Sequence, residues 1–430
     1  MKIITAILII ILFSAFKAEA GDSYWIVQQS PVKNNFTSCF FTDSTYGWIA
    51  GDSGVIIHTS DNGADWNVQI TGIRNNIYDI FFVSRDVGFA IAWELDATPP
   101  NYYGSVILST TNGGMNWNAV SFPDSNVFLN SVFFRDPMNG YLAGSGGSLY
   151  YTSDGGIIWN AAAVDSGIVF GFPVRKIKFF DNDYGLAVGG AVDIAGIVWK
   201  STNGGRSWRT IIVGPEPIND FTFLDNKNAL GVGGDFEYGS SKIESSDGGS
   251  NWLYSEFQVF GIANTIAYRT QNEAWVSLGI VDSFLVTTNG GASWELTGTP
   301  LQSRIYRIVF PDRRNGWAVG NDGIILKYNS SLIGIENNYS SVPENFILYQ
   351  NYPNPFNPET SIRYDLRKTA FVTLKIFDIR GNEIGQLVNE IQRQGSYNIK
   401  FKDENLPSGI YYCRLTSGNY SETKKMMLIK

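Results

Sequence analysis

The chain repeats one pattern of strand and turn, and this repeat limits the folds open to it more than any other feature. A strand of small and apolar residues begins at positions 47, 88, 140, 185, 229, 274 and 316, at intervals of 41 to 52 residues. Each of the first six strands is followed by a turn of the form Ser/Thr-x-Asp/Asn-x-Gly-x-x-Trp. A period of this length that carries only strand signals is typical of the blades of a β-propeller.

The turns have a structural explanation. The Asp or Asn side chain can accept hydrogen bonds from backbone N–H groups two residues further on, and the glycine supplies a positive φ. Three of the six acidic positions are Asn, so we expect a structural role and no metal or general-acid chemistry. The Trp should begin the next strand and cover the turn. The residues concerned are Asp61, Asn112, Asp154, Asn203, Asp247 and Asn289, with Trp66, Trp117, Trp159, Trp208, Trp252 and Trp294.

The two ends of the repeat region complement one another. Residues 24–29 resemble the strand that follows a turn, although no blade precedes them, and the seventh repeat ends at Tyr328 without a turn or a Trp. The sequence therefore predicts an all-β chain in which a seven-bladed β-propeller, residues 21–328, is closed by its N-terminal strand. A polar linker, residues 329–345, leads to alternating runs over 346–430 that predict a small seven-stranded Ig-like β-sandwich.

The first twenty residues have the features of a secretory signal peptide. An apolar run follows Lys2, and small residues precede an expected cleavage site between Ala20 and Gly21. No later run is long and apolar enough to cross a bilayer. We expect an exported, soluble and monomeric protein.

The longest connections between second and third strands fall on one face of the predicted propeller. They cover residues 93–104, 190–196, 234–241 and 279–282. Loops on a rigid scaffold commonly carry binding sites, and these contain aromatic and acidic side chains that could stack on and hydrogen-bond a sugar or a peptide. The alternative is ordinary solvated loops. The candidate residues are Trp93, Asp96, Tyr102, Tyr103, Asp193, Asp235, Glu237 and Tyr238.

Residue types for common catalytic chemistry are scarce. The single histidine, His58, occupies a repeat position that elsewhere holds Ser, Tyr, Lys, Glu and Val, while Cys39 and Cys413 lie in apolar positions of different domains and should be buried free thiols. We expect no catalytic residue, metal or cofactor. The formal charge of −8 argues against nucleic-acid binding, which needs a basic face.

The C-terminal module closely resembles the type A C-terminal sorting domain of the type IX secretion system of certain Gram-negative bacteria. The matching pieces include the run NYPNPFNP at 351–358, LPSGIYY at 406–412 and Lys-Lys-Met at 424–426. The resemblance implies the secretion machinery as a partner, passage across the outer membrane, and a cell-surface or extracellular location. The residues that carry it are Pro353, Asn354, Pro355, Gly409, Tyr411, Lys424 and Lys425.

The repeat region resembles the Asp-box repeat class of bacterial neuraminidases and, more closely, the photosystem II assembly and stability factor family. This implies a propeller and no particular activity. A sialidase-like glycoside hydrolase using acidic loop residues is one hypothesis, but the mature chain has no arginine before Arg74, where that family carries an arginine motif. We favour a non-catalytic module that binds protein or glycan, or acts as a scaffold, at the cell surface.

Overall fold

The computed structural model describes residues 24–96, 103–165, 171–330, 346–351, 353–366, 370–392, 395–402, 406–417 and 420–429. The chain divides into two compact units, residues 1–333 and 334–430. Within the described ranges all regular structure is β-strand, apart from four three-residue 3₁₀ helices, and no helix is long and apolar enough to cross a membrane.

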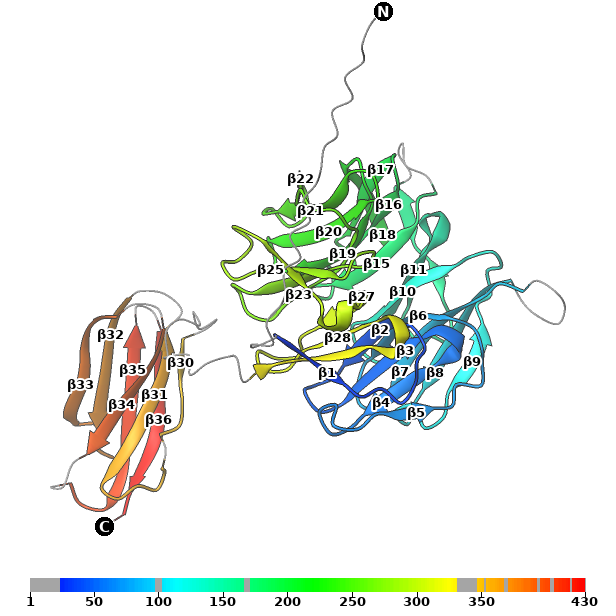
Figure 1. Ribbon diagram of the computed structural model, residues 1–430. Helices are drawn as coiled ribbons and strands as arrows, with labels where there is room; N and C mark the ends of the chain where they lie inside the picture. Colours follow the sequence, from blue (N-terminus) through cyan, green and yellow to red (C-terminus); the bar gives the residue numbers. More distant parts are fainter. Residues whose placement is uncertain are drawn as a thin grey trace, which may run out of the picture. The chain divides into compact units, whose positions relative to one another are not determined.

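Seven sheets make up the described part of the first unit (Figure 1). Six run in chain order from an inner to an outer strand. The first sheet contains β2 (Phe36–Phe41), β3 (Gly47–Gly51), β4 (Ile56–Thr59) and β5 (Asn67–Gln69), and the second contains β6 (Ile77–Phe82), β7 (Gly88–Glu94), β8 (Gly104–Thr110) and β9 (Asn118–Ser121). The third contains β10 (Leu129–Phe134), β11 (Gly140–Gly144), β12 (Leu149–Thr152) and β13 (Asn160–Ala161), and the fourth contains β15 (Val174–Phe179), β16 (Gly185–Ala191), β17 (Ala195–Ser201) and β18 (Ser207–Gly214), with β14 (Ala163–Asp165) parallel to β18. The fifth contains β19 (Ile218–Phe223), β20 (Ala229–Asp235), β21 (Gly239–Ser245) and β22 (Leu253–Glu256), and the sixth contains β23 (Ala263–Tyr268), β24 (Ala274–Leu278), β25 (Ser283–Thr287) and β26 (Glu295–Gly298).

The seventh sheet combines the two ends of the unit. It consists of β27 (Ile305–Val309), β28 (Trp317–Gly320), β29 (Ile325–Tyr328) and β1 (Trp25–Gln28). Strand β1 pairs antiparallel with β29, with Trp25 opposite Tyr328. The inner strands contact one another in chain order from β2 to β27, and β27 also contacts β2. Short 3₁₀ turns join second to third strands in three sheets, at η1 (Asp52–Gly54), η2 (Ser145–Gly147) and η4 (Asn321–Gly323), and η3 (Pro300–Gln302) precedes β27.

Aromatic stacking between neighbouring sheets explains why four of the second strands, β3, β7, β11 and β16, begin with glycine. The Phe82 ring stacks on Trp48 of the preceding sheet with ring centres 3.6 Å apart. The same ring covers Gly88 of its own sheet, where an added Cβ would lie 2.4 Å from it. Equivalent stacks join Phe134 to Phe89, and Phe41 to Trp317 of the seventh sheet. A side chain at this glycine would push the ring out of its stack.

The six turns share one hydrogen-bond pattern. The Ser or Thr hydroxyl accepts the N–H of the glycine four residues on, as Thr59 does from Gly63 at 2.9 Å. The Asp or Asn Oδ1 accepts the N–H of the residue four positions further on, as Asp61 does from Asp65 at 3.0 Å. The sequence predicted a bond from the residue two positions on, which is wrong because that N–H, of Gly63 in the first turn, is donated to the Thr59 hydroxyl. Asn acceptors do the same, at 3.0, 3.0 and 2.9 Å for Asn112, Asn203 and Asn289. The bond does not require a charge.

A buried polar network fills the centre of the unit. The third residue of every inner strand is polar, and the seven are Ser38, Asp79, Ser131, Lys176, Asp220, Thr265 and Arg307. Asp79 accepts hydrogen bonds from Ser38, Ser131 and Lys176 at 2.9, 3.2 and 2.8 Å. Asp220 accepts them from Lys178, Thr265 and Arg307 at 2.8, 2.7 and 3.2 Å. The two carboxylates, from β6 and β19, thus accept hydrogen bonds from side chains of the other five inner strands.

The second unit has its own hydrophobic core and two sheets in its described part. One contains β30 (Ile347–Leu348), β31 (Glu359–Leu366) and β34 (Gly395–Lys402), and the other β33 (Glu383–Gln392), β32 (Ala370–Phe377), β35 (Gly409–Ser417) and β36 (Tyr420–Leu428). Cys413 is buried in this core and Cys39 in the first unit, and both are free, which confirms the prediction. Burial raises the pKa of the Cys39 thiol to about 12 and that of Cys413 to about 11.

Candidate functional site

The structure separates the predicted loop residues into two groups. Trp93 and Tyr103 both lie against the Phe128 ring, with ring centres 5.3 and 5.1 Å from it. Asp193 and Asp235 lie together on the neighbouring hairpin tips β16–β17 and β20–β21, and Glu237 and Tyr238 follow Asp235 in the second tip. The sequence predicted one shared face, and the structure places an aromatic group and an acidic group on it.

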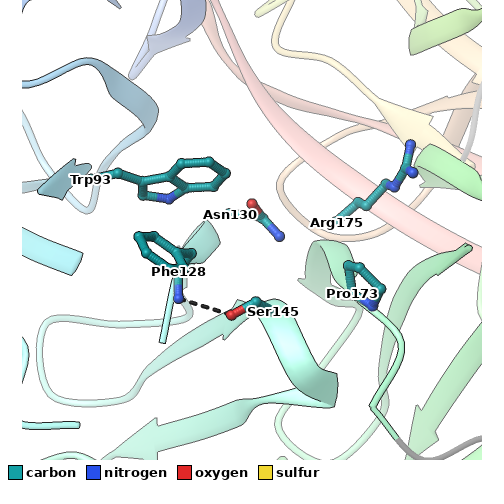
Figure 2. Close-up of a pocket in the computed structure, with 6 residues that line it drawn as sticks. All are labelled: Trp93, Phe128, Asn130, Ser145, Pro173 and Arg175. Atoms are coloured by element: carbon teal, nitrogen blue, oxygen red, sulfur yellow. Dashed lines mark hydrogen bonds between the residues drawn. The ribbon is translucent and has the colours of Figure 1, made fainter. Parts of the chain in front are cut away.

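Trp93 and Phe128 of the aromatic group border a pocket of about 460 Å³. It is lined by Trp93, Phe128, Asn130, Ser145, Pro173 and Arg175, which come from three successive sheets. Figure 2 shows Trp93 and Arg175 on opposite sides of the pocket with Asn130 between them. The pocket therefore offers two aromatic rings and a proline ring, with the Asn130 amide in the middle and the Arg175 guanidinium opposite Trp93.

Neighbouring contacts hold the aromatic wall in place. The Trp93 ring stacks on Tyr78 with centres 3.8 Å apart, and its Nε1 donates to the Leu129 carbonyl at 2.6 Å. The Ser145 hydroxyl accepts the Phe128 N–H at 2.9 Å. Because these contacts fix the rings before any ligand arrives, binding here would cost little side-chain entropy.

Arg175 is the one cationic side chain among the described residues that line this pocket. Its guanidinium donates to the Asn219 side-chain oxygen. No ion pair with a carboxylate is formed by Arg175 among the residues that the structure describes, and burial lowers the pKa of its guanidinium. A partly buried guanidinium without a counter-charge favours an anionic group in the adjacent space.

The acidic group contains a residue that sequence reasoning missed. Glu216, in the connection between β18 and β19, joins Asp193 and Asp235, and one carboxylate oxygen from each lies within 4.8 Å of the others. Glu216 and Asp235 are 1% and 3% exposed. Burial, and then the charges of Asp235, Asp193 and Glu237, raise the pKa of Glu216, although the Asp193 N–H opposes the shift. Oxygen ligands of this kind could hold a hard divalent cation, but the arrangement alone does not assign one.

The other predicted residues are more peripheral or lie outside the described ranges. Asp96 is exposed, and its N–H donates to Glu94 at 2.9 Å. The Asp235 carboxylate accepts the N–H groups of Glu237 and Tyr238 at 3.1 and 2.7 Å, which fixes the tip of its hairpin. Tyr102, like the expected cleavage residues Ala20 and Gly21, lies outside the described residues.

A signal for the missed pocket residues was present in the repeat. Asn130 and Arg175 occupy the second position of their inner strands, which in other repeats holds Thr37, Tyr78 and Asn219. Asn130 donates to the Val174 carbonyl of the next sheet, and Asn219 to Ala263, both at 2.9 Å. Comparing this position across repeats could have shown one arginine in a register of neutral polar residues.

In the second unit, the residues that carry the sorting resemblance are held to the last strand. Asn354 accepts the Met427 N–H at 2.8 Å and donates to the Lys425 carbonyl at 3.2 Å. The peptide bond between Asn354 and Pro355 is cis. Tyr411 donates its hydroxyl to the Pro407 carbonyl at 2.7 Å, and Lys424 pairs with Glu422 at 2.8 Å.

Comparison with known proteins agrees with both resemblances. Residues 350–430 match the secretion system C-terminal sorting domain. The photosynthesis system II assembly factor YCF48 model matches residues 108–229 and 229–329. The sorting domain of the type IX pathway implies interaction with the secretion machinery and transfer across the outer membrane, to the cell surface or the extracellular space.

Related proteins and structures cover the repeat region. The chain is 24% identical to the chloroplastic photosystem II stability/assembly factor of Arabidopsis thaliana over 312 residues, which is 66% of this chain and 72% of the relative. It is 23% identical to the photosystem II assembly lipoprotein Ycf48 of a Synechococcus strain over 331 residues, 72% and 89% of the two chains.

Solved structures share the fold. A structure described as YCF48 bound to D1 peptide superposes with a TM-score of 0.57 at 20% identity, covering 71% of this chain and 97% of that one. An ancestral GH74 enzyme gives 0.53 at 11% identity, covering 94% and 63%. At these identities the likeness concerns architecture and extends to enzymes and binding proteins alike. By its repeat region, the chain belongs to the photosynthesis system II assembly factor YCF48 family, and it carries a secretion system C-terminal sorting domain.

Proposed function

We propose that this chain is an exported, non-catalytic binding protein that holds an extended segment of a partner protein in the pocket between Trp93 and Arg175. The observation that carries the proposal is the pairing of fixed apolar walls with a guanidinium that has no carboxylate partner among the described residues. A peptide with an acidic group beside an aromatic or aliphatic side chain satisfies both features. The solved relative with a bound D1 peptide supports a peptide over a glycan.

The scaffold for this site is, in our proposal, a closed ring of seven blades. The β1–β29 pairing, the contact of β27 with β2 and the stack of Phe41 on Trp317 support closure. A closed ring removes exposed sheet edges between its first and last blades and holds the loop face rigid.

The proposal excludes glycoside hydrolysis as the main activity. Burial of Glu216 and Asp235 supports this, because a general acid must reach the glycosidic oxygen of its substrate. The raised pKa of Glu216 is a feature that would suit such an acid. For this reason the experiment also measures the turnover of glycosides.

The test uses the full chain in three parallel assays: a display library of random peptides, a glycan array, and a panel of chromogenic glycosides. We expect selected peptides to combine an acidic with an aromatic or aliphatic residue, without turnover of any glycoside. Trp93→Ala should lose these peptides, whereas Tyr238→Ala should retain them because Tyr238 lies in the acidic group. Glycan binding alone, or glycoside turnover, would overturn the proposal.

A further inference from the structure

Exposed apolar side chains occupy the tips of the two hairpins that carry the acidic group. Val192 and Ile194 flank Asp193 between β16 and β17, and Phe236 and Tyr238 flank Glu237 between β20 and β21. Their exposed fractions are 47%, 64%, 67% and 57%. These four residues and the exposed Asp193 and Glu237 between them form the hairpin-tip patch. The two tips lie side by side, since carboxylate oxygens of Asp193 and Asp235 approach within 4.8 Å.

The fold does not require these residues. In three other sheets the same connection is a three-residue turn with polar or glycine residues, Asp52–Gly54, Ser145–Gly147 and Asn321–Gly323. The hairpins β16–β17 and β20–β21 extend further and place bulky apolar side chains in solvent. Because exposing such side chains has a solubility cost, a group of them on projecting tips indicates contact with another molecule.

The patch carries uncompensated negative charge. Asp193 and Glu237 are exposed, and Glu216 and Asp235 lie beneath them. No Lys or Arg among the residues that the structure describes forms an ion pair with any of the four. The charge of Glu237, with those of Asp193, Asp235 and Glu216, raises the pKa of the Tyr238 hydroxyl. The local field therefore favours a cation.

We infer that the hairpin-tip patch is a second docking surface, which binds a protein segment that alternates Lys or Arg with aliphatic or aromatic residues. The apolar side chains of the segment would pack on Phe236 and Ile194, and its cations would lie over Asp193 and Glu237. This chemistry is opposite in charge to the pocket at Arg175, so the two surfaces select different segments. The inference does not depend on the function proposed for the pocket.

The test measures binding of the full chain to a fluorescent peptide in which Lys alternates with Leu and Phe. A matched peptide carries Glu at every Lys position. Asp193→Asn with Glu237→Gln removes the charges and keeps the shape, and Phe236→Ala with Ile194→Ala removes the apolar surface. The matched control, Asp65→Asn with Met115→Ala, changes an exposed carboxylate and a 78% exposed Met on two of the Asp/Asn turns.

We expect the Lys peptide to bind and the Glu peptide to bind at least about tenfold more weakly, with affinity falling as salt rises. Each patch variant should weaken the Lys peptide about three- to tenfold, and the charge variant should also flatten the salt dependence. Equal affinity for both peptides would overturn the inference, as would equal losses in the patch and control variants. Arg175→Gln should not alter this binding, so failure here is distinguishable from failure at the pocket.

Discussion

At the scale of single residues, one contact explains much of the repeat. The Phe that ends an inner strand covers the opening glycine of the next strand and stacks on an aromatic residue of the preceding sheet. A glycine is needed there because its missing Cβ makes room for the ring, and its backbone conformation is ordinary. Sequence alone located the glycines through their spacing. It could not give this reason, since the ring comes from another strand.

Gly88→Ala should lower the free energy of unfolding of the first unit by about 1 to 3 kcal/mol, because the new methyl overlaps the Phe82 ring. Gly298→Ala is the matched control, since no atom lies within 4 Å of the added Cβ at that strand position. Chemical denaturation of both variants, followed by tryptophan fluorescence, checks the prediction. An equal effect at the two positions would show that the Phe82 contact does not explain the glycine.

At the scale of elements, strand β1 offers the most direct test of how the two ends of the first unit meet. Trp25 is 3% exposed and packs against Trp275, Phe284, Phe310 and Tyr328 of the last two sheets. The pairing could be predicted because residues 24–29 copy an outer strand that lacks its own blade. The division of the loop face into aromatic and acidic groups could not be predicted from the sequence, because it depends on which loop tips meet in space.

Trp25→Ala should destabilise the first unit by about 3 to 5 kcal/mol, since it removes a buried ring at the junction of the two chain ends. Val27→Ala, on the same strand and 40% exposed, should cost less than about 1 kcal/mol. Thermal unfolding of the two variants gives the comparison. Similar melting temperatures for Trp25→Ala and the wild type would mean that β1 is dispensable.

At the scale of the whole molecule, the central network ties the inner strands together. Burial alone would raise the pKa of Asp79, but the charges of Lys176 and Arg307 hold it below its ordinary value. Asp220 shifts in the same direction, because Lys178 and Arg307 outweigh its burial. The polar third position of each inner strand is present in the repeat, but no network was predicted from it. Which of them pair across the centre is set by the arrangement of the sheets and was not predictable from spacing.

The folded first unit should therefore become less stable as the pH falls into the acid range. Because the folded-state pKa of both carboxyl groups lies below the unfolded value, their contribution is present above about pH 4 and is lost as pH falls through the folded pKa. Asp79→Asn should be less stable at neutral pH and show a shallower decline below pH 4. Asp86→Asn, an exposed carboxylate, should follow the wild-type curve. Parallel curves for Asp79→Asn and the wild type would contradict the prediction.

The most direct test of the central claim is an equilibrium titration of a library-selected peptide against the wild type, Arg175→Gln and Arg85→Gln. Arg85 is an exposed arginine paired with Asp43 and is not among the described residues that line the pocket, which makes it the matched control. A peptide-binding pocket predicts that Arg175→Gln weakens the complex by at least about tenfold at an unchanged melting temperature, and that Arg85→Gln binds as the wild type does. Equal affinity of all three proteins would contradict the assignment of the pocket as the binding site.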